Sequence, residues 1–179
     1  MAAAPATAAR KADVLEHVLH ALNETAFSTS LRESEWTFSW IETAHVLALA
    51  VMAGTVAVVD LRLLGVSFRQ QPVSRLVDQI TPVTWIGFGL MVLTGGLLFA
   101  AQPEANAGNP AFQIKLVLLA IAGLNLLSFH RIVFRDIAAW DNQARPPMKV
   151  RLSGAASLAL WSGIIVLGRL IAYFPEPIV

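Results

Sequence analysis

Four long apolar stretches dominate the chain and leave few folds open to it. They cover approximately residues 40–64, 82–101, 112–134 and 153–174. A run of about 20 mainly apolar residues is enough for a helix to cross the hydrocarbon core of a bilayer. Only 14% of the 179 residues are charged, whereas a typical soluble domain has about 25%. The sequence therefore predicts an all-α integral membrane protein with four spanning helices.

The connections between these stretches predict how the helices are arranged. They are short, which favours an up-down-up-down four-helix bundle. Basic residues gather in two connections, with three arginines in 60–78 and five lysines or arginines in 131–151. The only charged residue of the connection 102–111 is Glu104. Because an excess of Lys and Arg marks the cytoplasmic side, we expect these two connections inside and the termini outside. This pattern is typical of a multi-pass protein of the bacterial inner membrane with periplasmic termini.

The N-terminal region, residues 1–35, is expected to precede a membrane domain at 36–179, and it lacks the uninterrupted apolar segment of a secretory signal. The spacing of apolar residues in 12–24 predicts an amphipathic helix on the outer membrane surface. Its polar face carries His17 and His20, which we expect to be solvated, with metal binding as the alternative. Its apolar face carries Val14, Leu15, Val18, Leu19 and Leu22.

Four polar side chains remain inside the predicted spans once the loop charges are set aside: Glu42, His45, Lys115 and Arg169. Each lies within five residues of the outer end of its span, which at ~1.5 Å per residue is roughly 3–8 Å below the outer face. Ionisable residues within a membrane usually face the bundle interior and mark function. We therefore expect one polar site in the outer leaflet, with Met52 on the same helical face as Glu42 and His45.

Two simpler explanations compete with a functional site. Lys115 and Arg169 are close enough to helix ends to extend their charged groups to the lipid headgroups. Glu42, whose side chain is short, would form a purely structural pair with one of those two cations. Neither explanation accounts for His45.

His130 is expected to be separate from this site. It lies 18 residues into the third stretch, whereas His45 lies 5 residues into the parallel first stretch. Their depths then differ by roughly 20 Å, so the two histidines cannot both ligate one haem iron within a single chain. We expect His130 at the inner interface near Asp60 and Arg62, and a second cofactor there is the alternative.

The early histidine in "WIETAHVLALAVMAGTVAVVDLRLLG" and the lysine that opens "FQIKLVLLAIAGLNLLSFHR" resemble a known pattern. It is similar to that of small four-helix bacterial membrane proteins around the CopD copper-resistance family and the HemJ-type protoporphyrinogen oxidases, uncharacterised members included. In the HemJ-like group such a histidine and lysine are the functional pair, and b-type haem is bound. The resemblance implies that His45 is an axial ligand and Lys115 the functional lysine. It covers the first and third stretches and has no counterpart for Glu42.

The first functional hypothesis is a membrane-embedded b-type haem protein, a cytochrome b, in electron transfer. Imidazole is a standard haem ligand, and Lys115 and Arg169 would pair with the anionic propionates near the outer face. Glu42 would orient the ligand as a hydrogen-bond acceptor. The second axial position stays open, and its candidates are Met52, His17 or His20, a symmetry-related chain, or none, which leaves the iron five-coordinate.

Two other hypotheses stand beside it. A copper, iron or zinc ion would bind directly to the Glu42 and His45 pair, or the chain would be a non-catalytic anchor or accessory subunit of a larger redox complex. The absence of cysteine excludes disulfides, thiolate ligands and covalent c-type haem. The expected partners are the lipid bilayer and either a second copy of the chain or a periplasmic or membrane redox partner, with no nucleic acid.

Overall fold

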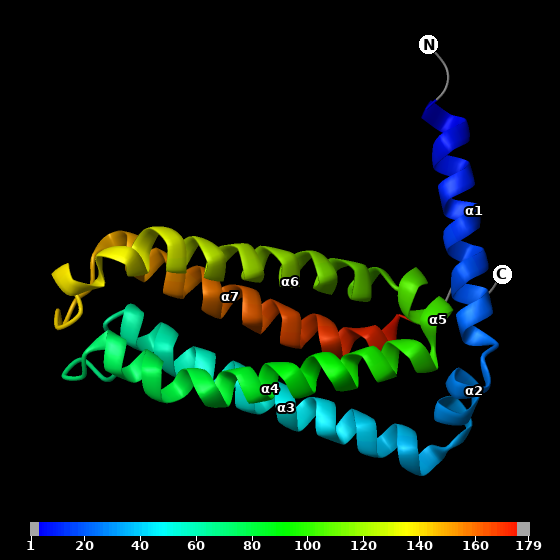
Figure 1. Ribbon diagram of the computed structural model, residues 1–179, viewed down its shortest axis with the longest axis horizontal. Helices are drawn as coiled ribbons and strands as arrows, with labels where there is room; N and C mark the ends of the chain where they lie inside the picture. The colour runs from blue at the N-terminus through cyan, green and yellow to red at the C-terminus, as the bar shows by residue number, and fades with distance from the viewer. Residues whose placement is uncertain (1–3, 175–179) are drawn as a thin grey trace.

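The computed structural model describes residues 4–174, which form helices and no strand. Four long helices run antiparallel along one axis, namely α3 (Glu35–Leu63), α4 (Val73–Ala101), α6 (Pro110–Ser128) and α7 (Met148–Leu170) (Figure 1). Each is long and apolar enough to cross a membrane. The predicted all-α membrane four-helix bundle is confirmed.

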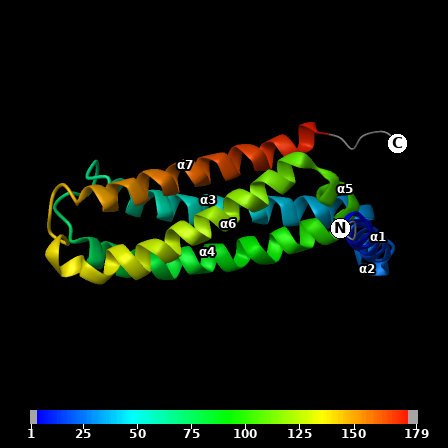
Figure 2. The same cartoon turned by 90° about the horizontal axis from the view of Figure 1, so that it is seen from above.

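Two helical hairpins make up the bundle. α3 packs mainly against α4 and α6 against α7, and a contact between α3 and α7 joins the hairpins (Figure 2). Glycines permit close approach, because a Cβ atom on Gly87 would lie 3.1 Å from the Cβ of Met52. A Cβ atom on Gly154 would likewise lie 3.1 Å from the carbonyl oxygen of Asp60. Small residues at such contacts let membrane helices come close together.

The helices begin before the predicted spans. α3 starts at Glu35 rather than at residue 40, α4 at Val73 rather than at 82, and α7 at Met148 rather than at 153. The 29 residues of α3 rise about 43 Å, which exceeds the ~30 Å of the hydrocarbon core. Helical structure therefore continues into the polar headgroup region, where hydropathy gives no signal. Pro82 lies inside α4.

The third helix differs from its prediction in the other direction. The regular part of α6 ends at Ser128 instead of continuing to residue 134. A π turn, η1 (Phe129–Val133), and a short 3₁₀ segment, η2 (Phe134–Ala139), follow it. Arg62 donates hydrogen bonds to the carbonyls of Gln71 and Asp141, at 2.8 and 3.1 Å, and so ties the two connections together. This end of the bundle, which carries connections 64–72 and 129–147, is called the loop end below.

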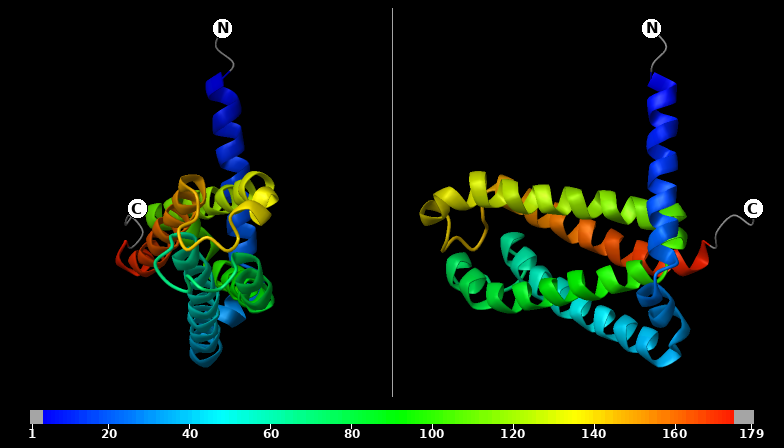
Figure 3. Two further views of the ribbon diagram at one scale, coloured as in Figure 1. Left: turned by 90° about the vertical axis from the view of Figure 1, so that its left-hand side faces the viewer. Right: turned by 45° about the vertical axis from the view of Figure 1, so that its right-hand side comes forward.

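The opposite end, called the terminal end, carries α1 (Ala4–Asn23), α2 (Ala26–Glu33), α5 (Pro103–Gly108) and η3 (Ile171–Tyr173). The first and the last of the described helices, α1 and η3, both lie on this side of the bundle (Figures 1 and 3). Nδ1 of His20 lies 2.9 Å from a carboxylate oxygen of Glu104, which attaches α1 to α5. Arg32 donates to the carbonyl of Ala101 at the end of α4, so α2 is attached as well.

α1 runs across the terminal end, roughly perpendicular to the four long helices, and projects beyond them (Figure 3). A helix perpendicular to spanning helices lies parallel to the membrane surface. Val14, Leu15 and Val18 of its apolar face are more than half exposed, at 59%, 58% and 56%. The surface helix expected at 12–24 stays a prediction, in which this apolar face would be in contact with lipid.

Candidate functional site

His45 lies on α3 with its imidazole half-buried against α4. Its Nδ1 atom is 2.9 Å from Oγ1 of Thr94. The Thr94 hydroxyl in turn donates to the carbonyl of Leu90, at 2.7 Å. Because the only hydrogen of that hydroxyl is used in this way, the Thr94 oxygen accepts a hydrogen bond from the Nδ1–H group of His45. The tautomer fixed by this contact leaves a lone pair on Nε2, which forms no hydrogen bond within residues 4–174.

Glycine and methionine residues form the surroundings of the ring. A Cβ atom on Gly95 would lie 3.1 Å from Cε1 of His45, so the glycine makes room for the imidazole. Ala48, Met52 and Met91 form a buried apolar cluster on the side facing the loop end. Met52, a candidate ligand, is only 1% exposed and lies against Gly87. On the side facing the loop end, His45 is therefore bordered by buried apolar side chains.

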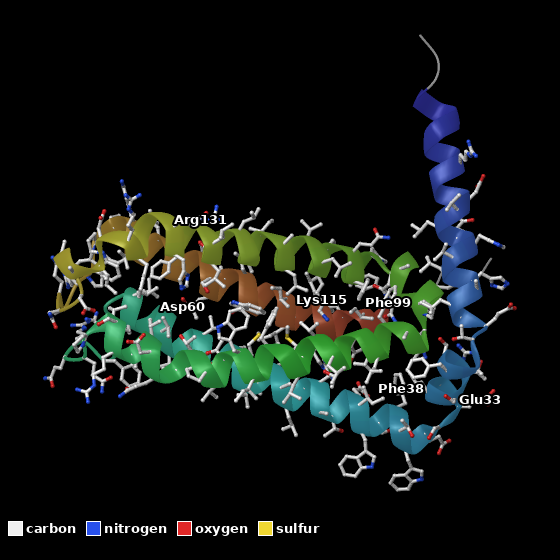
Figure 4. All side chains as sticks on the ribbon, in the orientation of Figure 1. Glu33, Phe38, Asp60, Phe99, Lys115 and Arg131 are labelled. Carbon is white, nitrogen blue, oxygen red and sulfur yellow. The ribbon has the colours of Figure 1, made fainter. Side chains whose placement is uncertain are left out.

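Lys115 approaches the same region from α6. Its side chain is half-buried, and its Nζ atom is 3.9 Å from the position of a Cβ atom on Gly168 of α7. Figure 4 shows Lys115 between α6 and the other long helices. The charges of Lys115 and Glu42 are both near enough to act on His45. Lys115 therefore lies within electrostatic range of His45, although the two residues are 70 positions apart in the sequence.

Glu42 and Arg169 lie at the margin of this region. Both side chains are exposed, although Glu42 was expected to share the inward face of α3 with His45 and Met52. The first turns of α3 diverge from the rest of the bundle (Figure 1), so the helical phase there no longer decides which residues are covered. No ion pair within residues 4–174 involves Glu42, Lys115 or Arg169, so the alternative of a purely structural pair has no such contact there.

The other histidines lie elsewhere. His130 is exposed in η1 at the loop end, where its ring stacks on Phe134 with centroids 5.5 Å apart. This position agrees with an interfacial side chain and with a depth far from that of His45. His17 and His20 line an open groove of about 680 Å³ between α1 and α5, together with Glu104. Since α1 crosses the end of the bundle without folding along it (Figure 3), these two histidines form a separate group.

Sequence reasoning missed several polar residues of the bundle. Thr94 carries no signal, because nothing in its spacing connects it with a histidine 49 positions earlier. Asp60 and Arg62 were expected at the inner interface, at the end of the 40–64 stretch and among the charges of the 60–78 connection. Both belong to α3 and are buried, with 4% and 0% of their surface exposed. Their burial gave no signal in the sequence, because it depends on distant segments: Arg62 donates to the carbonyl of Asp141, and Gly154 of α7 lies against the backbone of Asp60.

The arrangement determines which kinds of metal site the protein can form. Within the described part of the chain, no three residues among His, Asp and Glu gather in a way that could hold a metal ion. His45 therefore offers a single imidazole nitrogen rather than a set of ligands. A porphyrin supplies four nitrogen ligands of its own, so a haem needs only an axial ligand from the protein.

Comparisons with known proteins add one finding. Searches among curated proteins and among solved structures found no match. A family model matches residues 35–174, which include all four long helices and exclude α1 and α2. The matched segment covers most of the chain and includes His45, Thr94 and Lys115. The chain therefore belongs to a family of unknown function, DUF6644.

Proposed function

We propose that the protein is a membrane-embedded b-type haem protein that transfers electrons, with Nε2 of His45 as an axial ligand of the iron. The observation that carries this proposal is the Thr94 contact, which leaves Nε2 of His45 with a free lone pair. Histidines that ligate metals usually donate the hydrogen of the other ring nitrogen to a neighbouring acceptor, which fixes the tautomer and the ring orientation. The contact with Thr94 holds His45 in that way.

Neighbouring residues would hold the rest of such a group. Lys115, half-buried near His45, and Arg169, exposed near the end of α7, are both cations at the terminal end. Charge-assisted hydrogen bonds between these cations and the two propionates would orient the haem with its carboxylates toward the terminal end. The buried cluster of Ala48, Met52 and Met91 would close the site on the side facing the loop end. The haem, when bound, supplies the one-electron chemistry of iron, and the protein supplies ligation and orientation.

The second axial ligand of the iron would come from a residue outside this site, or the second axial position would stay open. Met52 lies seven residues beyond His45 on the same helix, about 10 Å away along the axis, and is buried in packing. A second copy of the chain in a homo-oligomer would supply the ligand, or the iron would stay five-coordinate. The proposed setting is a bacterial inner membrane with the terminal end on the periplasmic side, where a redox partner would meet α1.

A bare copper, iron or zinc ion is less well supported, because His45 and Glu42 are a single pair and Glu42 is exposed. The HemJ-like and CopD-like resemblance adds support to the haem proposal, since it matches His45 and Lys115, which the fold brings together. The family match carries no function of its own.

An absorption spectrum tests the proposal. The protein, purified in detergent from cells supplied with haem precursor, would show a Soret band and, after dithionite reduction, the sharp α and β bands of a b-type cytochrome. His45→Ala should lose these bands, because the only axial imidazole of the site is removed, whereas His130→Ala should keep them. A featureless spectrum of the unaltered protein, or equal loss in both variants, would contradict the proposal.

A further inference from the structure

A second polar position lies between α3 and α7, toward the loop end of the bundle. A cavity of about 90 Å³ separates the two helices there. Its polar lining consists of Asp60, Ser162 and the indole of Trp161, and its other walls are apolar. One water molecule needs roughly 10–15 Å³ of such space, so the cavity has room for several.

The carboxyl group of Asp60 has unusual surroundings for a charged side chain. Only 4% of the residue is exposed, and its Oδ2 atom has no hydrogen-bond partner within the described residues. Ser157, one helical turn before Trp161 on α7, lies close enough to interact with the carboxyl group. Figure 4 shows Asp60 among the long helices rather than in the connection that follows α3. Buried polar groups nearly always have a partner, so the open oxygen needs an explanation.

Among the described residues, no cation forms an ion pair with this carboxyl group. Arg62, two residues further along α3, directs its guanidinium to the carbonyls of Gln71 and Asp141. On α7, the charged residues nearest to the cavity are Arg151 and Arg169, at the two ends of the helix. On α4, the charged residues near this depth are Arg75 and Asp78, and both are exposed. No ion pair within residues 4–174 includes Asp60.

We propose that Asp60 is a proton-binding site within the membrane, which takes up and releases a proton through the cavity between α3 and α7. Proton uptake forms one O–H bond and converts the carboxylate into a neutral carboxylic acid, and release reverses this step. An ionised carboxylate is costly in an apolar interior without a cation, and intramembrane carboxyl groups of this kind mark proton relays. The proposal is independent of the haem, because the cavity includes neither His45 nor Lys115.

The cavity suits a proton better than a metal ion. Calcium and magnesium ions take six or more oxygen ligands, and the lining offers one carboxyl group and the hydroxyl of Ser162, with Ser157 nearby. A proton needs one oxygen atom and a chain of water molecules or hydroxyl groups to reach it. The Oδ2 atom without a partner is the acceptor for that proton.

Infrared spectroscopy and carbodiimide labelling of the full chain in detergent test the proposal. The C=O stretch of a protonated carboxyl group should appear, change in amplitude as the pH is varied and shift in D₂O, because the cavity admits water. Asp60→Asn should lose that band, and Asp78→Asn, which removes an exposed carboxyl group from α4, should keep it. Dicyclohexylcarbodiimide, which modifies protonated carboxyl groups in apolar surroundings, should label Asp60 in the unaltered protein, as located by peptide mass spectrometry.

The results of these two measurements either support or overturn the proposed proton site at Asp60. The labelling uses the unaltered protein, so a failure of Asp60→Asn to fold would leave a decisive measurement. Absence of both the band and the adduct, or a band that is the same at every pH at which the bundle is folded, would overturn the proposal. Slower labelling in sodium chloride than in potassium chloride at one pH would overturn it too, because Asp60 would then bind a sodium ion.

Discussion

The hydroxyl group of Thr94 governs the chemistry of His45. It accepts from Nδ1 at 2.9 Å and donates to the carbonyl of Leu90 at 2.7 Å, so its orientation is set by the backbone of α4. An imidazole in solution exchanges its proton between both nitrogens and rotates freely. On α3 the ring has one tautomer and one orientation. The binding of a ligand to Nε2 would therefore cost less conformational entropy.

Thr94→Val tests this role, because valine has nearly the same shape but cannot accept a hydrogen bond. Loss of the partner that orients a metal-ligating histidine typically weakens binding by about 10–100-fold. We therefore expect a haem affinity lower by that factor in a haem titration followed at the Soret band.

Two controls accompany this experiment. Thr94→Ser keeps the hydroxyl and should bind haem as the unaltered protein does. Thr84→Val removes a hydroxyl of the same helix that contacts Thr55 instead, and it should leave the affinity unchanged. Unchanged affinity in Thr94→Val would show that the hydrogen bond to His45 plays no part in ligation.

Single residues of the site could be predicted from the sequence only where their chemistry conflicts with an apolar segment. His45 and Lys115 stand out for this reason, and the fold brings them near each other. Thr94 did not stand out, because a threonine is compatible with a membrane helix and its contact depends on how α3 and α4 are aligned. Asp60 was expected at the inner interface, but its burial could not be predicted, because it depends on how α3 packs against α7.

At the scale of helices, the contact between α3 and α4 positions the candidate site. Gly87 allows this contact, since a Cβ atom there would lie 3.1 Å from both the backbone nitrogen and the Cβ of Met52. A Cβ atom on Gly89, two positions along the same helix, would have no atom within 4 Å. The two glycines of "GFG" therefore have different roles, although they look alike in the sequence.

Gly87→Leu should destabilise the bundle, because the leucine side chain has to push α4 away from α3. Excess side-chain volume in a packed interior typically costs about 1–3 kcal/mol. We expect a lower midpoint of thermal unfolding in detergent, measured by circular dichroism, and a weaker Thr94 contact with His45.

Gly89→Leu is the matched control for the helix contact. It adds the same volume on a lipid-facing surface and should leave the unfolding midpoint almost unchanged. Similar midpoints for the two variants would mean that α3 and α4 are not in close contact at Gly87.

The bounds of the helices were predicted less well than their existence. Hydropathy reports only the part of each helix that lies in hydrocarbon, so the polar first turns of α3, α4 and α7 gave no signal. The end of α6 at Ser128 was missed for a different reason. The apolar pattern continues through Phe134, and only the backbone geometry of η1 and η2 shows that the regular helix has ended.

At the scale of the whole molecule, α1 and α5 mark one end of the bundle as different from the other. The terminal end has a perpendicular amphipathic helix, and the loop end has basic connections closed by Arg62 and Asp141. Asp141 also accepts from the backbone nitrogen and the hydroxyl of Ser74 at the start of α4. The number of helices and their alternating direction could be predicted from hydropathy. The hydrogen bonds of Asp141 with Arg62 and Ser74 could not, because they join segments that are distant in the sequence.

The expected orientation, with the terminal end outside, can be measured because the chain has no cysteine. Gln102→Cys and Gln70→Cys place single thiols at exposed positions of the terminal end and of the loop end, respectively. In intact cells a membrane-impermeant maleimide should label Gln102→Cys at once, and Gln70→Cys only after the cells are made permeable. The reverse pattern would place the basic connections outside, against the distribution of Lys and Arg.

The central claim is that Nε2 of His45 ligates a haem iron, and chemical rescue tests it most directly. His45→Gly removes the imidazole and leaves a space beside Gly95 and Thr94. The variant, checked for helical structure by circular dichroism, should bind no haem with a histidine-type spectrum by itself. It should regain the b-type bands of the unaltered protein when free imidazole is added. A spectrum in His45→Gly that equals that of the unaltered protein without imidazole, or no b-type spectrum in the unaltered protein, would contradict the account.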